Sequence, residues 1–78
     1  MPVFIRHKGW KFYIYIGDST LRPHIHIRKD GSELAVWLDD VSVKTNKRVK
    51  SKDERDLVRV VADNQMELME AWNELFGD

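Results

Sequence analysis

The stretch Pro23-His24-Ile25-His26-Ile27-Arg28-Lys29-Asp30-Gly31-Ser32-Glu33-Leu34-Ala35-Val36-Trp37 places two alternating runs on either side of an Asp-Gly pair. Asp-Gly is a strong signal for a two-residue hairpin loop, because a type I′ turn needs positive φ at both central positions. Such a loop sets the register, and a slip of one residue would move every side chain to the opposite face. The predicted pairs are Lys29–Ser32, Arg28–Glu33, Ile27–Leu34, His26–Ala35, Ile25–Val36 and His24–Trp37.

Further strands are predicted on both sides of this hairpin. Residues 3–6 favour a short strand, and residues 10–16 alternate between bulky apolar residues and Lys or Tyr, as a half-buried strand does. With strands over 24–29 and 32–38, and a last one over 41–44, the sheet has four to five strands. The segment KTNKRVKSK over residues 44–52 carries five basic side chains and predicts a basic loop.

The C-terminal part of the chain predicts a helix. An apolar stripe at helical spacing continues to Phe76 without a change of phase, which favours one helix over about residues 52–76. Ser51 and Glu54 have the spacing of a capping box at its start. The alternative is a kink near Asn64, which could cap a second helix. The predicted fold is α+β, a small antiparallel sheet with one face covered by a long C-terminal helix.

Composition restricts the class of protein. The chain of 78 residues, with 42% hydrophobic and 33% charged residues, suits one globular domain over residues 1–78. It has no cysteine, which excludes disulfides, thiol nucleophiles and thiolate metal sites. No apolar run approaches the roughly 20 residues of a membrane span, and no signal peptide follows Met1. We therefore expect a cytoplasmic protein that does not bind membranes.

The net charge of zero conceals an asymmetry along the chain. Residues 1–59 hold 13 basic against 8 acidic residues, a surplus of five, whereas residues 60–78 hold five acids and no base. This separation favours a charge-complementary partner, or a nucleic-acid surface kept apart from an acidic one. A helix this long also exceeds what so small a sheet can cover. Its residues Met69, Trp72 and Phe76 are therefore candidates for a homodimer or partner interface.

The face of the sheet opposite the helix is expected to lie in water. Its side chains combine histidine, which transfers protons near neutral pH, with arginine, which binds phosphate, and aromatic rings, which stack on bases. This combination favours an RNA-binding surface or a metal-independent ribonuclease. The catalytic candidates are His26, His24 and Arg28, and the nucleic-acid-binding candidates are Tyr13, Tyr15, Trp37, Lys47, Arg48 and Lys50.

Structural roles compete with these functional ones. A His24–Trp37 pair could simply stabilise the hairpin, and the basic segment also fits a solvated run of charges. Ala35 leaves room for His26, whereas His24 lies beside a large ring. His26 is therefore the better candidate for chemistry and His24 for packing.

A zinc site is a weaker interpretation of the histidine pair. Two histidines are not enough, since a site needs three or four ligands. His7, Asp39 or Asp40 would have to complete it, and no spacing demands that. We therefore expect no metal or other cofactor.

The chain contains three distinctive motifs, which are Pro23-His24-Ile25-His26-Ile27, Trp37-Leu38-Asp39 and Glu67-Leu68-Met69-Glu70-Ala71-Trp72-Asn73-Glu74-Leu75-Phe76-Gly77. With these motifs it resembles a bacterial family, the domain of unknown function family 4160. The resemblance covers almost the full chain, and the basic segment 44–52 departs from it. It implies a toxin-like component of a two-gene module resembling toxin–antitoxin pairs, with a small protein partner encoded nearby and RNA as a candidate target. The alternative is a non-enzymatic partner-binding or regulatory module that acts through the long C-terminal helix.

Overall fold

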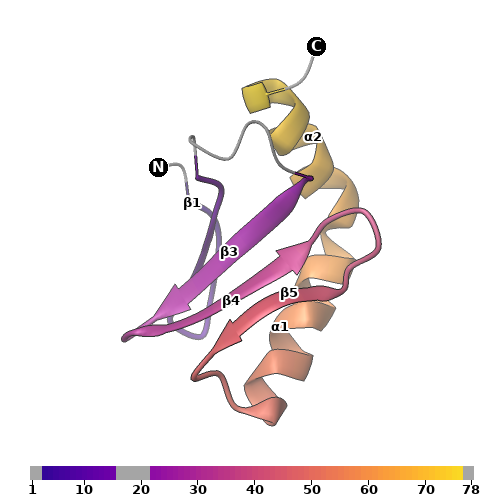
Figure 1. The fold of residues 1–78 in the computed structure, drawn as a ribbon. Coiled ribbons are helices and arrows are strands. Elements are labelled where there is room, and N and C mark those ends of the chain that lie inside the picture. The colour runs from indigo at the N-terminus through magenta and orange to yellow at the C-terminus, as the bar shows by residue number, and fades with distance from the viewer. Residues whose placement is uncertain (1–2, 16–21, 77–78) are drawn as a thin grey trace.

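A computed structural model describes residues 3–15 and 22–76 of the chain, and these form five strands followed by two helices (Figure 1). The strands make one sheet in the order β1-β2-β3-β4-β5, and every neighbouring pair is antiparallel. Both helices lie against the same side of this sheet (Figure 1). The fold is therefore α+β, as predicted. The elements are β1 (Val3–His7), β2 (Trp10–Tyr13), β3 (His24–Lys29), β4 (Ser32–Trp37), β5 (Val43–Lys47), α1 (Ser51–Asp63) and α2 (Gln65–Phe76).

The β3–β4 hairpin has the predicted register. All six predicted pairs are present, from Lys29 opposite Ser32 to His24 opposite Trp37. The two loop residues, Asp30 and Gly31, have φ values of 49° and 84°, as a type I′ turn requires. The turn chemistry and the alternation of apolar residues therefore specify the same pairing.

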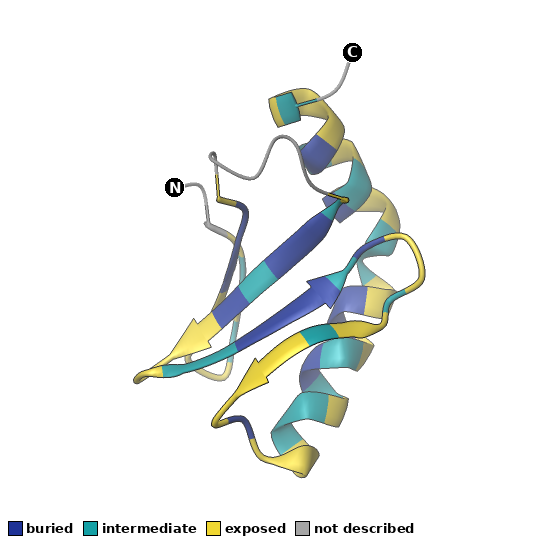
Figure 2. Ribbon diagram, viewed as in Figure 1, coloured by how far each residue is buried: buried dark blue, intermediate teal, exposed yellow. Residues whose placement is uncertain are grey.

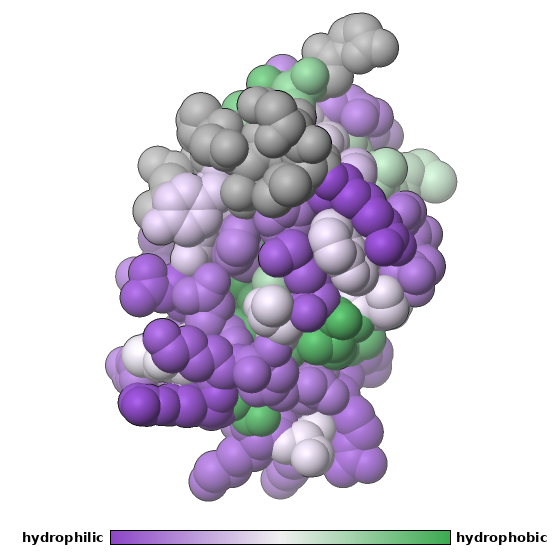
Figure 3. Space-filling model, in the orientation of Figure 1, coloured by the Kyte–Doolittle hydropathy of each residue, from purple (hydrophilic) through white to green (hydrophobic). Residues whose placement is uncertain are grey.

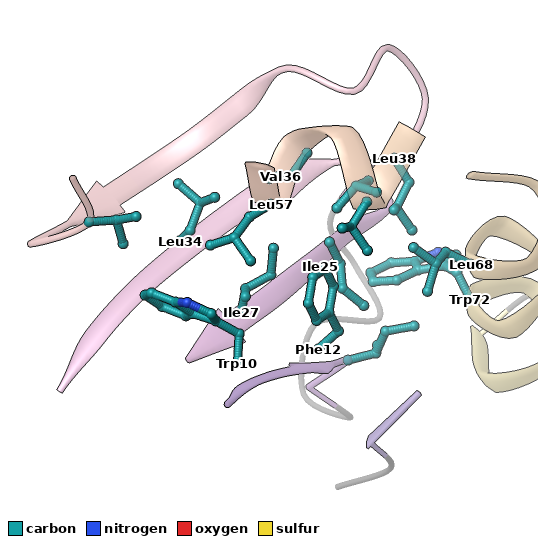
Figure 4. Packing of buried hydrophobic residues seen from close by; sticks show 14 residues of the cluster. Trp10, Phe12, Ile25, Ile27, Leu34, Val36, Leu38, Leu57, Leu68 and Trp72 are labelled. Carbon is teal, nitrogen blue, oxygen red and sulfur yellow. The ribbon is translucent and has the colours of Figure 1, made fainter. Parts of the chain in front are cut away.

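The core lies between the sheet and the helices (Figure 4). Burial follows the pleat only in part, because β3 is buried at His24, Ile25 and Ile27, and β4 is buried at three successive residues, Leu34 to Val36 (Figure 2). Each of these large side chains contributes about 1.5–3 kcal/mol of transfer free energy on full burial. The core residues from the central strands are Phe12, Ile25, Ile27, Leu34 and Val36, and those from the helices are Leu57, Val60, Val61, Leu68 and Trp72.

The single helix expected over residues 52–76 is instead two helices, α1 and α2, separated at Asn64. The Asn64 side-chain amide donates to the carbonyl of Val60 at 2.8 Å, and its φ of −119° lies outside the helical range. The side-chain amide of the next residue, Gln65, donates to the backbone carbonyls of Leu38 and Asp39 at 2.7 and 2.9 Å. The junction is therefore bonded to the chain just beyond the end of β4. No helix among the described residues is long and apolar enough to cross a membrane.

This break changes the surroundings of the expected interface residues. Trp72 is only 5% exposed and belongs to the core, and its ring lies 4.4 Å from that of Phe76. Phe76 and Met69 are partly buried against the same core. The apolar side chains that α2 exposes are Met66 and Leu75. A helix redirected at Asn64 can pack its second half on the sheet, so Trp72 is not on the surface.

The last strand lies further along the chain than predicted. The expected strand over 41–44 and basic loop over 44–52 are replaced by β5, which ends at Lys47. Val41 has a positive φ of 57°, and Asp40 accepts hydrogen bonds from the backbone and side chain of Ser42, which forms a turn. An edge strand with almost wholly exposed side chains shows no apolar alternation, so its sequence resembles a loop.

Two other boundaries also differ. The expected strand over 10–16 pairs only to Tyr13, and its last position, Ile16, lies outside the described residues. The capping box at Ser51 is wrong, because Lys50 is the N-cap and makes no side-chain capping bond. Glu54 instead accepts a hydrogen bond from the Asn46 amide at 2.6 Å, and Asn46 also bonds to the backbone of Val49.

Trp72→Ala tests whether this side chain belongs to the core. We expect a loss of about 3–5 kcal/mol in the free energy of unfolding, because a large buried ring leaves a cavity. The control is Met66→Ala, since Met66 is 74% exposed and its replacement should stay within about 0.5 kcal/mol. Urea denaturation followed by circular dichroism measures both. Equal stability of Trp72→Ala and the parent would contradict this packing.

Candidate functional site

The open face of the sheet carries a row of charged side chains. Cross-strand partners point to the same face, and the registers align one residue from each strand. Four members of this row are basic, and the one carboxylate, Glu33, lies in β4. Hydrophilic residues predominate on this face of the molecule (Figure 3). We call this set the basic row, and its members are Arg6, Lys11, Arg28, Glu33 and Lys47.

An aromatic cluster lies beside the basic row, towards α2. The rings of Tyr13 and His26 are stacked with centroids 5.5 Å apart, and Tyr15 meets His26 edge-on at 5.3 Å. His24 contacts His26 at 5.0 Å and Trp37 at 5.6 Å. Such ring pairs are favourable beyond the area that they bury. The aromatic cluster consists of Tyr13, Tyr15, His24, His26 and Trp37.

The expectation that this whole face lies in water is wrong for the aromatic cluster. Tyr13 is 5% exposed and His24 1% exposed, whereas His26 and Trp37 are partly exposed. The ring of Trp72 in α2 also lies 5.4 Å from that of His24. Neighbouring rings shield each other, so alternation along the strand does not by itself give exposure.

His24 has the surroundings of a structural residue. Its Nδ1–H donates to the backbone carbonyl of Arg22 at 2.7 Å, which sets the tautomer because a carbonyl only accepts. Its ring is held among those of His26, Trp37 and Trp72. The structure therefore places His24 in the interior.

His26 lies where the aromatic cluster meets the basic row. Its side chain is 14% exposed, and its Nδ1 lies 3.1 Å from Oε2 of Glu33. The other carboxylate oxygen of Glu33 lies 3.8 Å from Nε of Arg28. A carboxylate in this position orients the imidazole through one of its ring nitrogens. Glu33 thus joins two catalytic candidates, a role that the sequence analysis did not assign to it.

The remaining nucleic-acid candidates occupy different positions. Lys47 belongs to the basic row, whereas Arg48 and Lys50 lie in the connection from β5 to α1 and outside that row. The Trp37 ring is flanked by two cations, with Arg22 Cζ 4.4 Å and Lys44 Nζ 5.5 Å from its centroid. The structure therefore brings Lys47 and Arg28 together and leaves Arg48 and Lys50 apart from them.

A pocket of about 380 Å³ opens beside the basic row, at the end of the sheet where the β1–β2 and β3–β4 turns lie. Lys11, Arg28 and Tyr13 contribute to its wall, together with residues of the β1–β2 and β3–β4 turns. Sequence analysis missed Lys11, because the register between β2 and β3 depends on a connection whose length does not specify a turn type. The sequence feature that could have indicated Lys11 is its position two residues before Tyr13, which puts both side chains on the same face of the strand.

The family comparison agrees with the motifs in the sequence. Residues 9–73 match the family described as Domain of unknown function (DUF4160). The chain belongs to this family. No curated protein and no solved structure matches it.

In this DUF4160 domain the third histidine has a role at the edge of the sheet. His7 Nε2–H donates to Asp56 of α1 at 2.8 Å, so β1 is joined to the helix layer. Arg59 donates to the same carboxylate at 2.8 Å, and Lys8 Nζ lies 3.5 Å from it. Hydrogen bonds from Arg59 and then from His7 hold the pKa of Asp56 well below its ordinary range.

Metal ligation receives no support from these positions. His7 is directed to Asp56, and Asp39 forms a two-point ion pair with Arg22 at 2.6 and 2.7 Å. Within residues 3–15 and 22–76, no group of three or more potential ligands is arranged to hold an ion.

The lowered pKa of Asp56 predicts an acid-dependent loss of stability. Its contribution is present above the unfolded-state pKa of about 3.9 and is lost as the pH falls through that value towards the folded-state pKa. We therefore expect Asp56→Asn to be clearly less stable than the parent at pH 7, and this difference to shrink between pH 5 and pH 2. Urea denaturation across this range measures it.

The matched control is Asp53→Asn, which removes a carboxylate from the same helix but leaves the contacts with His7, Lys8 and Arg59 in place. A stability difference for Asp56→Asn that did not change with pH would contradict the role of the charged carboxylate.

Proposed function

We propose that this protein is a toxin-like component of a two-gene module that binds single-stranded RNA on the open face of its sheet and cleaves it without a metal. The observation that supports this most directly is the contact of His26 with Glu33, the carboxylate of the basic row. Phosphate-binding groups and a proton-transfer group thus share one surface.

The basic row suits a polyanion. It crosses all five strands, and neighbouring strands lie about 4.8 Å apart, so the row extends roughly 19 Å across the sheet. Its four basic side chains are all exposed. Four phosphate contacts to a single strand give a slope of about −3 in a plot of log affinity against log salt concentration. The exposed ring of Tyr15 offers a platform on which a base can stack.

The cleavage chemistry needs a base, an acid and a cation. The 2′-hydroxyl of the ribose attacks the adjacent phosphorus, its oxygen–phosphorus bond forms, and the bond to the 5′-oxygen breaks. His26 takes the proton from the 2′-hydroxyl. A water molecule gives a proton to the leaving 5′-oxygen and recovers one from the protonated His26. Arg28, two residues along β3, stabilises the charge that develops on the phosphate. The products are a 2′,3′-cyclic phosphate and a 5′-hydroxyl end.

His26→Ala separates cleavage from binding. We expect cleavage of a single-stranded RNA, measured on gels in the presence of EDTA, to fall by about 10²–10⁴-fold, as for the loss of a general acid or base. The affinity, measured by fluorescence anisotropy, should change little, whereas Lys47→Gln should weaken it and reduce the salt slope by about 0.7. Growth arrest on expression should likewise require His26.

The control is Arg55→Gln, which removes one exposed positive charge from α1, on the other side of the sheet. It should leave affinity and cleavage unchanged. Growth arrest that persists in His26→Ala would overturn the catalytic role, and RNA affinity insensitive to salt and to Lys47→Gln would overturn binding on this face. Suppression of the arrest by the product of the neighbouring gene would support the two-gene module.

A second candidate function, partner binding through α2, is favoured by one observation. Met66 is 74% exposed on a helix that carries three glutamates and no basic residue. An apolar side chain among acids suits a basic partner with an apolar pocket. Co-purification with the neighbouring gene product should be lost in Met66→Asp and retained in Lys47→Gln. The reverse result would place the partner on the sheet.

A further inference from the structure

We infer that the pocket at the turn end of the sheet binds a phosphate monoester, so that the protein recognises the phosphorylated end of an RNA strand. This inference rests on the proposed function for the source of the ligand. The pocket itself follows from side chains that the sheet and two hairpin turns bring together.

Two glycine turns form the rim of the pocket. Gly9 in the β1–β2 turn and Gly31 in the β3–β4 turn both line it, with φ values of 85° and 84°. Side chains rarely adopt this conformation, so both positions favour glycine. At Gly9 a Cβ atom would also lie 3.2 Å from Cε of Lys29. At these two positions the rim is backbone without a side chain, which leaves this part of the pocket open to solvent.

The charges of the pocket favour an anion with more than one negative charge. Lys11, Arg28 and Lys29 line it against the single acid Asp30, a surplus of two positive charges. A phosphate monoester carries about −1.5 to −2 charges at pH 7, whereas a phosphodiester within a strand carries one. The Arg28 side chain is 52% exposed, and the geometry of a guanidinium allows two-point binding of phosphate oxygens.

Lys29 contributes mainly charge. Its ammonium donates to the carbonyl of Lys8 at 3.2 Å and lies 5.9 Å from the centroid of the Trp10 ring. Lys11 and Arg28 therefore remain as the groups placed to contact the ligand directly.

The Tyr13 hydroxyl is the second, independent sign of a ligand. This oxygen is buried and makes no hydrogen bond of good geometry with any described residue, although Arg28 lies close enough to influence it. Burial raises the pKa of Tyr13, with Arg28 acting in the opposite direction, so the group remains a hydroxyl donor at neutral pH. A buried hydroxyl without a partner is costly. Tyr13 and Arg28 both line the pocket, so a shift of Arg28 on ligand binding would let a phosphate oxygen accept the hydrogen bond of this hydroxyl.

The pocket lies next to the proposed catalytic group. Arg28 and His26 are two residues apart on β3, which is about 6.7 Å along a strand. Tyr13 lines the pocket, and its ring is stacked on that of His26. A terminal phosphate held by Lys11 and Arg28 therefore brings the first linkage of the strand towards the His26–Glu33 pair.

The experiment compares three RNA oligonucleotides of one sequence with an internal fluorophore. One carries a 5′-phosphate, one a 3′-phosphate, and one hydroxyl groups at both ends. We expect one phosphorylated form to bind about tenfold more tightly than the hydroxyl form, as for gain of charge-assisted hydrogen bonds. The form that gains affinity identifies which end enters the pocket. Nucleoside 5′- and 3′-monophosphates, titrated by calorimetry, test the pocket without RNA.

Variants assign the preference to the pocket. Lys11→Gln and Tyr13→Phe should each remove most of the preference for a terminal phosphate. Lys47→Gln should lower the affinity for all three oligonucleotides by the same factor, and Arg55→Gln should leave all three affinities unchanged. Tyr13→Phe should also keep or raise the melting temperature, because it removes a buried hydroxyl that lacks a partner. Loss of binding in a protein of unchanged or greater stability cannot come from misfolding.

The possible failures are distinguishable. Equal affinity for the three oligonucleotides, with no binding of either monophosphate, would overturn the pocket inference and leave RNA binding intact. Binding of a monophosphate that requires Tyr13, without binding of any oligonucleotide, would keep the pocket as a phosphate site and overturn the RNA proposal. A preference that survives both Lys11→Gln and Tyr13→Phe would place the terminal phosphate elsewhere.

Discussion

The two-residue turn at Asp30 and Gly31 is the constraint on which the rest of this structure depends. Side chains along a strand alternate between faces, so a turn that sets the pairing of β3 with β4 also sets which residues enter the core. The same register puts His26, Arg28 and Glu33 together on the other face. Core packing and the candidate site therefore have one local cause.

The candidate site has two parts with different physical surroundings. The aromatic cluster is largely dry, because its rings cover one another and Trp72 lies against His24. The basic row, to which every strand contributes one side chain, is exposed to solvent. His26 lies at the boundary, where a carboxylate can orient its ring and where solvent still reaches it. Such a boundary combines a rigid support with access, which a proton-transfer group needs.

Sequence reasoning succeeded where local chemistry determines structure. The Asp-Gly turn and the alternation on both sides gave the whole hairpin register, and the apolar face of Trp10, Phe12 and Ile14 was likewise found in the core. It failed where tertiary contacts decide. The sequence favoured one helix and offered a kink near Asn64 only as the alternative. The bonds of the Gln65 side chain to carbonyls beyond β4 accompany the break, and a stripe at constant helical spacing cannot reveal them.

The same limit applies to the site. Placing His26 and Arg28 on one face required only the hairpin, whereas the basic row required the pairing of β2 with β3 and of β4 with β5. Burial of Tyr13 and His24 depends on rings from several elements, so the alternating pattern could not distinguish a wet face from a dry one.

The strand order also has a consequence for how the chain folds. Each strand pairs with its neighbour in the sequence, so the sheet can grow by successive hairpins without closing a long loop first. Chains dominated by such near-neighbour pairing have low contact order, and low contact order goes with fast folding. The helices then supply the contacts between distant parts of the sequence, as in the bond from His7 to Asp56. The hydrogen bond that joins the first strand to the helix layer spans 49 residues of the sequence, so it closes the kind of long loop that the sheet avoids.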